Sequence, residues 1–183
     1  MEYFDIVDEN GKPTGDVISR QEAHEKGIRH RTSHVWILRK KEGRLQILLQ
    51  KRSKNKDSFP GCYDISSAGH IPAGQGYVAS ALRELQEELG YTAEAEQLQY
   101  CGKRSFQFQR KFHGKMFHDH QVSSVFVLWL DFDEDAFTLQ KEEVESVRWF
   151  DFEACKKAVA DGSIPNCIFS EELDMLTKNE KMY

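Results

Sequence analysis

Three glutamates carry the clearest chemical signal in the sequence. Glu84, Glu87 and Glu88 are spaced by three and four residues, so an α-helix would place all three on one face. Leu85 and Leu89 follow the same period on another face, which favours a helix. Two interpretations are open. The carboxylates form a solvated acidic face, or they hold a hard cation such as Mg²⁺, which prefers oxygen ligands.

The wider stretch favours the cation. From Gly69 to Tyr91 the sequence reads GHIPAGQGYVASALRELQEELGY. It closely resembles the signature box of the Nudix hydrolases, G-x5-E-x7-R-E-U-x-E-E-x-G-U, in which U is a bulky apolar residue. One position departs, because the first glutamate of the box falls at Gln75, a neutral amide. This departure leaves the family resemblance intact and opens the alternative of a ligand-binding module with weakened catalysis.

The resemblance implies a hydrolase that cleaves a diphosphate linkage, in a nucleoside diphosphate joined to another group or in a related phosphate substrate. The cofactor would be Mg²⁺ or Mn²⁺, which polarises the phosphoryl group and lowers the pKa of bound water. By the same resemblance, Glu87 and Glu88 are metal ligands and Glu84 is a ligand or the general base. Arg83 orients the cluster, and the backbone carbonyl of Ala68 is a further ligand in some members.

Members of the family often recruit one more carboxylate from outside the box. Glu142, Glu143 and Asp119 are candidates, and the sequence does not choose between them. Each also reads as ordinary surface charge.

The N-terminal half is also similar to type I isopentenyl-diphosphate isomerase, a branch of the same superfamily. The shared features are Ile6-Val7-Asp8-Glu9-x-Gly11, Ala23-His24, His30-Arg31, Gln50-Lys51-Arg52-Ser53, Phe59-Pro60-Gly61 and Gly69-His70. In the isomerase, histidines at positions like His24, His30 and His70 bind a metal beside an active-site cysteine and glutamate. The alternative reading of each histidine is an ordinary hydrogen-bonded side chain.

The isomerase residues themselves are missing. The slot of the cysteine holds Ala68, and the acidic partners fall near Asp119 and Gln121. Moving a double bond needs an acid and a base, and alanine supplies neither. An isomerase-like enzyme is therefore the third and weakest interpretation, after the hydrolase and the binding module.

Composition sets the remaining bounds. A chain of 183 residues with 39% hydrophobic and 30% charged residues is expected to form a single domain, residues 1–183. Within it, residues 1–32 are expected to form an N-terminal hairpin and short helix, and residues 69–91 form the box. It has no apolar run of transmembrane length and no basic-then-apolar leader, so we expect a cytoplasmic protein without a membrane partner. The net charge of -5 argues against a nucleic-acid polymer as partner. By analogy with the family, the N-terminal hairpin or the C-terminal helices are candidate surfaces for a homodimer.

The local patterns predict a mixture of strands and helices. Strands are expected at Tyr3–Val7, Asp16–Ile18, Ser33–Leu38, Leu45–Gln50, Leu98–Gly102, Arg104–Phe112, Val122–Leu130 and Val144–Phe150, and C-terminal helices at Phe152–Ala160 and Glu171–Lys178. Such an order implies a layered α/β (α+β) domain, and the resemblance implies the Nudix fold, a mixed β-sheet sandwiched between helices.

Two patterns carry weaker signals. Phe106, Phe108 and Phe112 alternate with polar residues, which fits a half-buried strand better than single-strand nucleic-acid stacking in so acidic a chain. His118 and His120 share one face of an extended strand, yet no third ligand lies nearby in sequence to complete a zinc site.

Overall fold

The computed structural model describes residues 1–177 and is built on a mixed β-sheet. Its strands are β1 (Tyr3–Val7), β2 (Pro13–Ser19), β3 (His30–Lys41), β4 (Arg44–Arg52), β5 (Tyr63–Asp64), β6 (Ser67–His70), β7 (Gln99–Phe112), β8 (Lys115–Trp129) and β9 (Val144–Asp151). Its helices are α1 (Arg20–Lys26), α2 (Tyr77–Leu89), α3 (Phe152–Asp161) and α4 (Ser170–Leu176), with 3₁₀ turns at Ala95–Gln97 and Glu134–Ala136.

The main sheet has the strand order β5-β4-β3-β8-β7, with β6 paired to β3 and β9 paired to β4. Strands β3 and β8 run parallel and the other pairs are antiparallel. Strand β3 pairs first with β6 and then with β4, so the sheet divides beside β6. That division is where the acidic helix meets the sheet.

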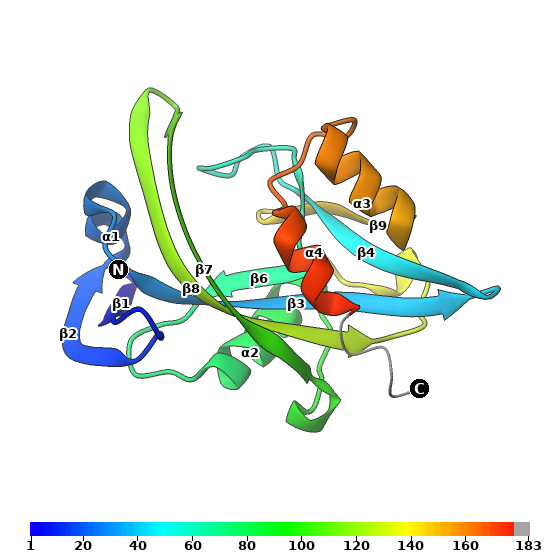
Figure 1. Ribbon diagram of the computed structural model, residues 1–183, viewed down its shortest axis with the longest axis horizontal. Helices are drawn as coiled ribbons and strands as arrows, with labels where there is room; N and C mark the ends of the chain where they lie inside the picture. Colours follow the sequence, from blue (N-terminus) through cyan, green and yellow to red (C-terminus); the bar gives the residue numbers. More distant parts are fainter. Residues whose placement is uncertain (178–183) are drawn as a thin grey trace.

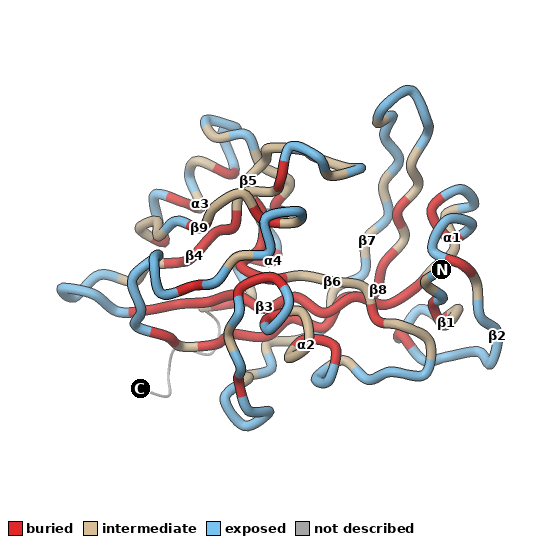
Figure 2. The backbone as a smooth tube through the Cα atoms, turned by 180° about the vertical axis from the view of Figure 1, so that it is seen from behind, coloured by how far each residue is buried: buried red, intermediate tan, exposed pale blue. Residues whose placement is uncertain are grey.

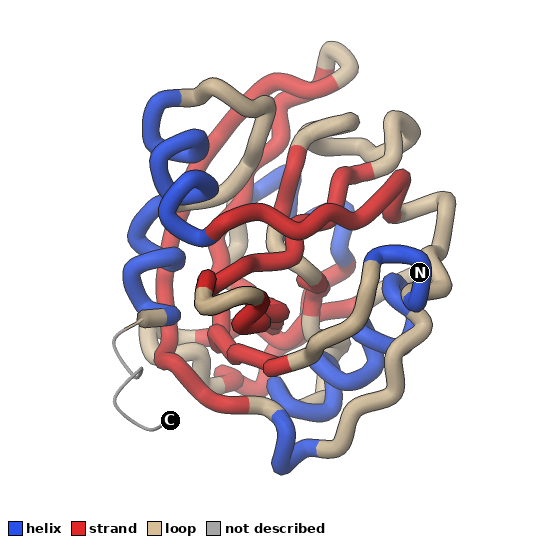
Figure 3. Tube along the Cα trace, turned by 90° about the vertical axis from the view of Figure 1, so that its right-hand side faces the viewer, coloured by secondary structure: helices blue, strands red, loops and turns tan. Residues whose placement is uncertain are grey.

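Helices cover both faces of this sheet (Figures 1 and 3). On one face, Leu85 and Leu89 of α2 pack in a cluster with Val35 and Ile37 of β3. On the other face, α3 and α4 pack on side chains that alternate with these, including Trp36 of β3. Full burial of a leucine contributes about 1.5–3 kcal/mol, so the apolar stripe of α2 fixes the rotation of the helix. The predicted sandwich of a mixed sheet between helices is confirmed.

The N-terminal hairpin and α1 form a separate element beside the main sheet. Strands β1 and β2 form a two-stranded sheet of their own, and the turn between them uses Gly11 at φ +77°. Phe4 of β1 also forms an isolated bridge with Pro72, in the loop before α2. Ser19 caps α1 by accepting a hydrogen bond from the backbone of Glu22. Phe4 is fully buried, which anchors the hairpin against the rest of the protein.

Strands β7 and β8 form a long hairpin that projects beyond the body of the molecule (Figure 1). Its tip is exposed, whereas the half of β8 within the sheet is buried (Figure 2). Residues of β8 from Gln121 to Leu128 are all buried, as expected for a central strand. None of the helices in the described part of the chain is long and apolar enough to cross a membrane.

The sequence patterns placed several boundaries wrongly. The two strands expected at Leu98–Gly102 and Arg104–Phe112 are one continuous strand, β7, because a bulge near Gly102, whose φ is +138°, absorbs the irregularity. Strand β8 begins seven residues before the expected Val122, within polar sequence that pairs with β7. The last predicted helix, Glu171–Lys178, corresponds to α4, and Lys178 lies outside the described residues.

Candidate functional site

The predicted helix of carboxylates is α2, which begins after Gly76 and ends at Gly90. Gly90 adopts the left-handed conformation at φ +65°, where its backbone N–H closes the last turn. Burial of the apolar stripe on the sheet leaves Glu84 and Glu88, one turn apart, between the helix and β6. The fold therefore brings the predicted carboxylates to the division in the sheet.

Glu88 is a buried carboxylate held by neutral donors. Its side-chain Oε2 accepts hydrogen bonds from Ser67 Oγ at 2.8 Å, Ala68 N at 3.2 Å and Gln50 Nε2 at 3.2 Å. Burial, with the nearby charge of Glu84, raises the pKa of Glu88 to about 8. Within residues 1–177 no basic side chain forms an ion pair with Glu88. A buried carboxylate in this position is neutralised by a proton or by a cation.

Arg83 connects the other two glutamates. Its Nη2 donates to Glu84 Oε1 and its Nη1 to Glu87 Oε2, both at 2.7 Å. Burial raises the pKa of Glu84, and the charge of Arg83 opposes that shift. Arg83 Nη2 also lies 3.3 Å from the carbonyl oxygen of His70, which fixes the guanidinium against β6.

Gly69 is required by the close approach of α2 to β6. A Cβ atom at this position would lie 2.1 Å from Glu84 Cδ. Its neighbour Ala68 donates its N–H to Glu88, so the strand contacts two of the three box glutamates through backbone. The assignment of the Ala68 carbonyl as a metal ligand stays a prediction.

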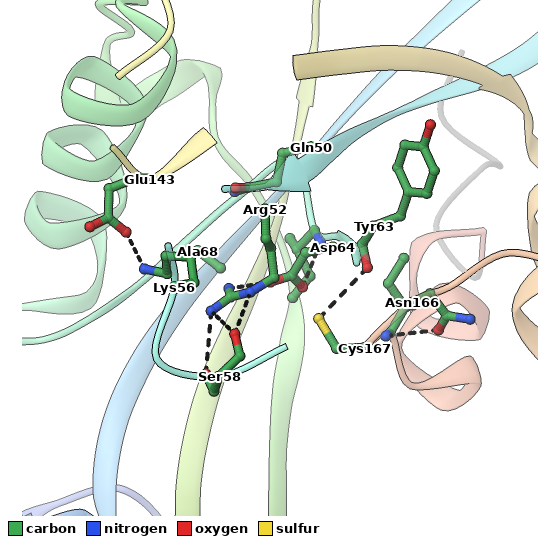
Figure 4. A network of polar contacts seen from close by, with 12 residues as sticks. Gln50, Arg52, Lys56, Ser58, Tyr63, Asp64, Ala68, Glu143, Asn166 and Cys167 are labelled. Carbon is green, nitrogen blue, oxygen red and sulfur yellow. Dashed lines mark hydrogen bonds and ion pairs between the residues drawn. The ribbon is translucent and has the colours of Figure 1, made fainter. Parts of the chain in front are cut away.

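Sequence reasoning missed a cation that lies next to this cluster. Lys56, in the loop after β4, forms an ion pair with Glu143, and its charge lowers the pKa of Glu88 (Figure 4). Arg52 braces the loop, because its guanidinium donates to the carbonyl of Ser58 at 2.9 Å and to Asp64 Oδ2 at 2.8 Å. No sequence motif marks Lys56, because the fold of a polar loop decides where it points.

The three candidate carboxylates outside the box differ in position. Glu143 pairs with Lys56 near the end of α2. There the backbone N–H of Gln140 donates a hydrogen bond to the backbone carbonyl of Glu88. Glu142 is exposed. Asp119 lies among histidines, 3.6 Å from His30.

The residue that departs from the box, Gln75, is exposed in the loop before α2. Its backbone carbonyl oxygen accepts a hydrogen bond from Arg31 Nη2 at 2.9 Å. Arg31 also pairs with Asp5 at 2.7 Å, and Asp5 accepts from the backbone of Gly74. The backbone of this loop is therefore fixed independently of the side chain at position 75.

A second cluster consists of the three histidines and Asp119. One ligand atom from each of His24, His30, His70 and Asp119 lies within 4.8 Å of every other. The Nε2 atoms of all three histidines and Oδ1 of Asp119 are buried and have no hydrogen-bond partner among the described residues. Burying four polar atoms without hydrogen bonds costs free energy unless a ligand binds between them.

The surroundings of this cluster set the tautomers. His24 Nδ1 lies 3.2 Å from the carbonyl of His118 and His30 Nδ1 lies 2.8 Å from that of Ile28. A carbonyl oxygen accepts only, so both rings carry their proton on Nδ1 and present a free lone pair on Nε2. Burial lowers the pKa of His24 and of His30 to about 4, which keeps both rings neutral.

Phe4 and Asp119 complete the cluster. The Phe4 ring stacks on His30 and on His70, at centroid distances of 4.9 and 4.8 Å. Burial raises the pKa of Asp119 to about 6.

His118 and His120 contribute no ligand atom to the cluster, and His120 Nε2 instead accepts a hydrogen bond from Arg29. The fold therefore brings together His24, His30 and His70, the histidines of the isomerase resemblance, and leaves the pair His118 and His120 outside the cluster.

Comparison with known proteins supports both resemblances. The NUDIX domain family matches residues 28–166. Nudix hydrolase 3 of Arabidopsis thaliana is 41% identical over 83% of this chain, and the match spans 19% of that protein, so the chain spans about a fifth of its length. The crystal structure of DR0079 from Deinococcus radiodurans superposes with a TM-score of 0.68 at 20% identity, covering 94% of this chain and 98% of that one.

The isomerase likeness is partial. Isopentenyl-diphosphate Delta-isomerase of Pectobacterium atrosepticum is 41% identical over 46% of this chain and 45% of its own length. Of the two positions at which the sequence departs from the isomerase resemblance, Ala68 lies in β6 and Gln121 in β8.

Proposed function

Because the chain belongs to the NUDIX domain family, we propose that it hydrolyses a diphosphate linkage with a divalent metal ion bound by the glutamates of α2. The observation that supports this most is Glu88. It is a buried carboxylate beside a second carboxylate, Glu84, with no basic partner in the described part of the chain. A divalent cation would remove the penalty that burial and repulsion impose on these two charges.

The residues present fit such an ion. Glu88 receives all three of its donors on Oε2, so within residues 1–177 its Oε1 has no donor. Glu84, Glu87 and Glu88 supply the oxygen ligands that Mg²⁺ and Mn²⁺ prefer, and Arg83 holds the first two in place. The ion would polarise the phosphoryl group and activate a water molecule. Glu84, whose pKa burial raises, is suited to take the proton of that water.

Lys56 and Glu143 complete the proposed site. Lys56 is a cation close enough to the carboxylate cluster to lower the pKa of Glu88, and we expect a substrate phosphate to replace Glu143 as its partner. Once its ion pair with Lys56 is broken, Glu143 is available to the site. We therefore assign Glu143, in preference to the exposed Glu142, as the carboxylate from outside the box. Asp119 is assigned to the histidines.

The test is product release from a panel of substrates. The panel contains nucleotide sugars, dinucleotides, nucleoside di- and triphosphates, coenzyme A and prenyl diphosphates, each with Mg²⁺ and with Mn²⁺. Glu87→Gln is the test variant, and Glu96→Gln, which makes the same charge change at an exposed position in a 3₁₀ turn, is its control. We expect turnover of one diphosphate class in the wild-type and Glu96→Gln proteins and its loss in Glu87→Gln. Equal turnover in all three would overturn the assignment.

Gln75 motivates one alternative, a binding module that retains the fold and has lost catalysis. The same panel, followed by thermal shift, distinguishes it: ligand-induced stabilisation without turnover favours binding. A large rate increase in Gln75→Glu would indicate an attenuated enzyme.

We also propose that the histidine cluster holds a second divalent ion, of the transition-metal type. Neutral imidazole nitrogens with one carboxylate are ligands typical of Zn²⁺ and related ions. The four buried, unpartnered ligand atoms support this assignment. Calorimetric titration of Zn²⁺ in excess Mg²⁺ tests it: the wild-type protein binds one Zn²⁺ and His24→Ala does not. Equal binding by both would exclude the cluster as the site.

A further inference from the structure

A buried row of polar side chains leads from the histidine cluster across the sheet to α4. Its members, in spatial order, are Asp119, Gln121, Thr32, His34 and Glu172, and all five are buried. Gln121 and Asp119 lie on β8, Thr32 and His34 lie on the parallel neighbour β3, and Glu172 lies on α4. This is the face of the sheet on which apolar residues pack farther along the same strands.

Each member of this row is hydrogen-bonded to the next. Gln121 Nε2 donates to Asp119 Oδ2 at 2.7 Å, and Thr32 Oγ1 donates to Gln121 Oε1 at 3.1 Å. Thr32 Oγ1 lies 3.2 Å from His34 Nε2, and His34 Nδ1 lies 2.8 Å from Glu172 Oε1. The row is therefore one connected network between the metal-ligand cluster and the C-terminal helix.

The two donors next to the histidine cluster both point toward Asp119. The Gln121 amide must turn its NH₂ toward Asp119, because the opposite orientation would place two oxygens together. Thr32 Oγ1 donates to Gln121 Oε1, and it also lies 2.6 Å from Ser123 Oγ and 3.2 Å from His34 Nε2. His34 Nδ1 donates to Glu172 Oε1. Glu172 is fixed in turn by Trp36 Nε1 at 2.9 Å.

We propose that Gln121 is a positioning residue for the metal ligand Asp119, and that Thr32 and the His34–Glu172 pair fix its orientation. This inference rests on the proposed metal site of the histidine cluster. Oδ2 of Asp119 accepts a hydrogen bond from Gln121, whereas Oδ1 faces the histidines without a hydrogen-bond partner in the described chain. A carboxylate fixed by one oxygen presents the other at a defined position, which is how hydrogen bonds behind a ligand raise metal affinity.

A network that merely filled the core would be replaceable by apolar side chains of the same size, since such replacement is often neutral or stabilising. Affinity for the metal separates that possibility from positioning. Gln121→Met keeps the length of the side chain and removes the donor to Asp119. Thr32→Val keeps the shape and removes the hydroxyl, whereas Thr32→Ser retains it. Ser124→Ala, on the opposite face of β8 by strand alternation, is the control for loss of a buried hydroxyl.

The experiment is titration with Co²⁺ and Zn²⁺ in excess Mg²⁺, which keeps the box glutamates occupied, with Asp119→Asn as reference. Affinity is measured by calorimetry, the ligand field by visible absorption of bound Co²⁺, and folding by thermal unfolding. We expect Gln121→Met to lower affinity about 10- to 100-fold and to shift the Co²⁺ spectrum. Thr32→Val should act in the same direction, and Thr32→Ser and Ser124→Ala should match the wild type.

The outcomes are distinct. If the wild type binds Co²⁺ and Asp119→Asn weakens binding, but Gln121→Met and Thr32→Val bind as the wild type does, positioning is overturned while the metal site stands. If the wild type shows no Co²⁺ binding that depends on Asp119, the metal site and this inference both fail. Should Gln121→Met not fold, Thr32→Val and Thr32→Ser decide the question alone. Hydrolysis by the box enters none of these measurements.

Discussion

Replacement of Glu88 by glutamine should stabilise the metal-free protein at alkaline pH while removing its activity. The pKa of Glu88 is raised to about 8, so the folded state retains a proton that the unfolded chain releases near pH 4.5. Between these two pH values the folded state binds more protons than the unfolded state, and the free energy of unfolding falls as the pH rises. The contribution is present below pH 4.5 and is lost as the pH passes through 8.

The size of the effect follows from that interval. A difference of about 3.5 pKa units corresponds to a loss on the order of 5 kcal/mol of unfolding free energy, since one unit is worth about 1.4 kcal/mol. Glutamine keeps an oxygen that accepts the hydrogen bonds of Ser67 and Ala68, and it cannot ionise. Glu88→Gln should therefore remove most of the slope. In EDTA at pH 8.5 it should be more stable than the wild type.

Urea denaturation at several pH values, in EDTA throughout, measures this directly. Glu96→Gln serves as control, because its carboxylate is exposed. Adding Mg²⁺ should reverse the ranking at pH 8.5, since the ion stabilises only a protein that retains its ligand. A wild-type protein whose stability is flat from pH 5 to 8.5, or a Glu88→Gln variant with the same slope as the wild type, would refute the electrostatic argument.

Three further predictions follow from the two clusters, two on their packing and one on isomerase activity. Gly69→Ala places a methyl group against Glu84 Cδ, so hydrolysis should fall on the order of 100-fold, while Gly76→Ala, which has open space, should stay near wild type in the same assay. Phe4→Ala removes a fully buried ring that stacks on two histidines, and urea denaturation should show a loss of about 3–5 kcal/mol, against little change for the exposed Tyr3→Ala. Prenyl diphosphates should not be isomerised, and proton–deuterium exchange into isopentenyl diphosphate, followed by NMR, would contradict the argument from Ala68.

The acidic helix could be predicted because its information is local. Spacing places Glu84 and Glu88 on one side of α2, and the apolar stripe turns that side toward β6. The sequence cannot show how deeply each glutamate is buried. Glu88 is buried and Glu87 is exposed, although the two are neighbours, because successive side chains of a helix point about 100° apart and Glu88 faces β6. The difference in pKa between Glu88 and an ordinary glutamate is therefore a property of tertiary packing.

The residues that sequence reasoning missed come from elements whose placement depends on distant contacts. Gln50 reaches Glu88 only because the sheet divides between β4 and β6. Lys56 reaches Glu143 only because Arg52 and Asp64 brace a polar loop. Asp119 was one of three equivalent candidates by sequence, and the pairing of β8 with β3 decides its place among the histidines.

The two clusters meet at one peptide of β6, which has consequences for their metals. Gly69 packs under Glu84 of the box, and the next residue, His70, belongs to the histidine cluster. The box offers carboxylate oxygens, which suit Mg²⁺, whereas the other cluster offers neutral imidazoles, which suit ions such as Zn²⁺. The two clusters therefore differ in the kind of ion that each prefers. Protein stripped with EDTA and then given Mg²⁺ alone should therefore recover hydrolysis with the histidine cluster still empty of zinc, which metal analysis of the active protein would establish. A requirement for zinc would instead mean that both clusters act on one substrate.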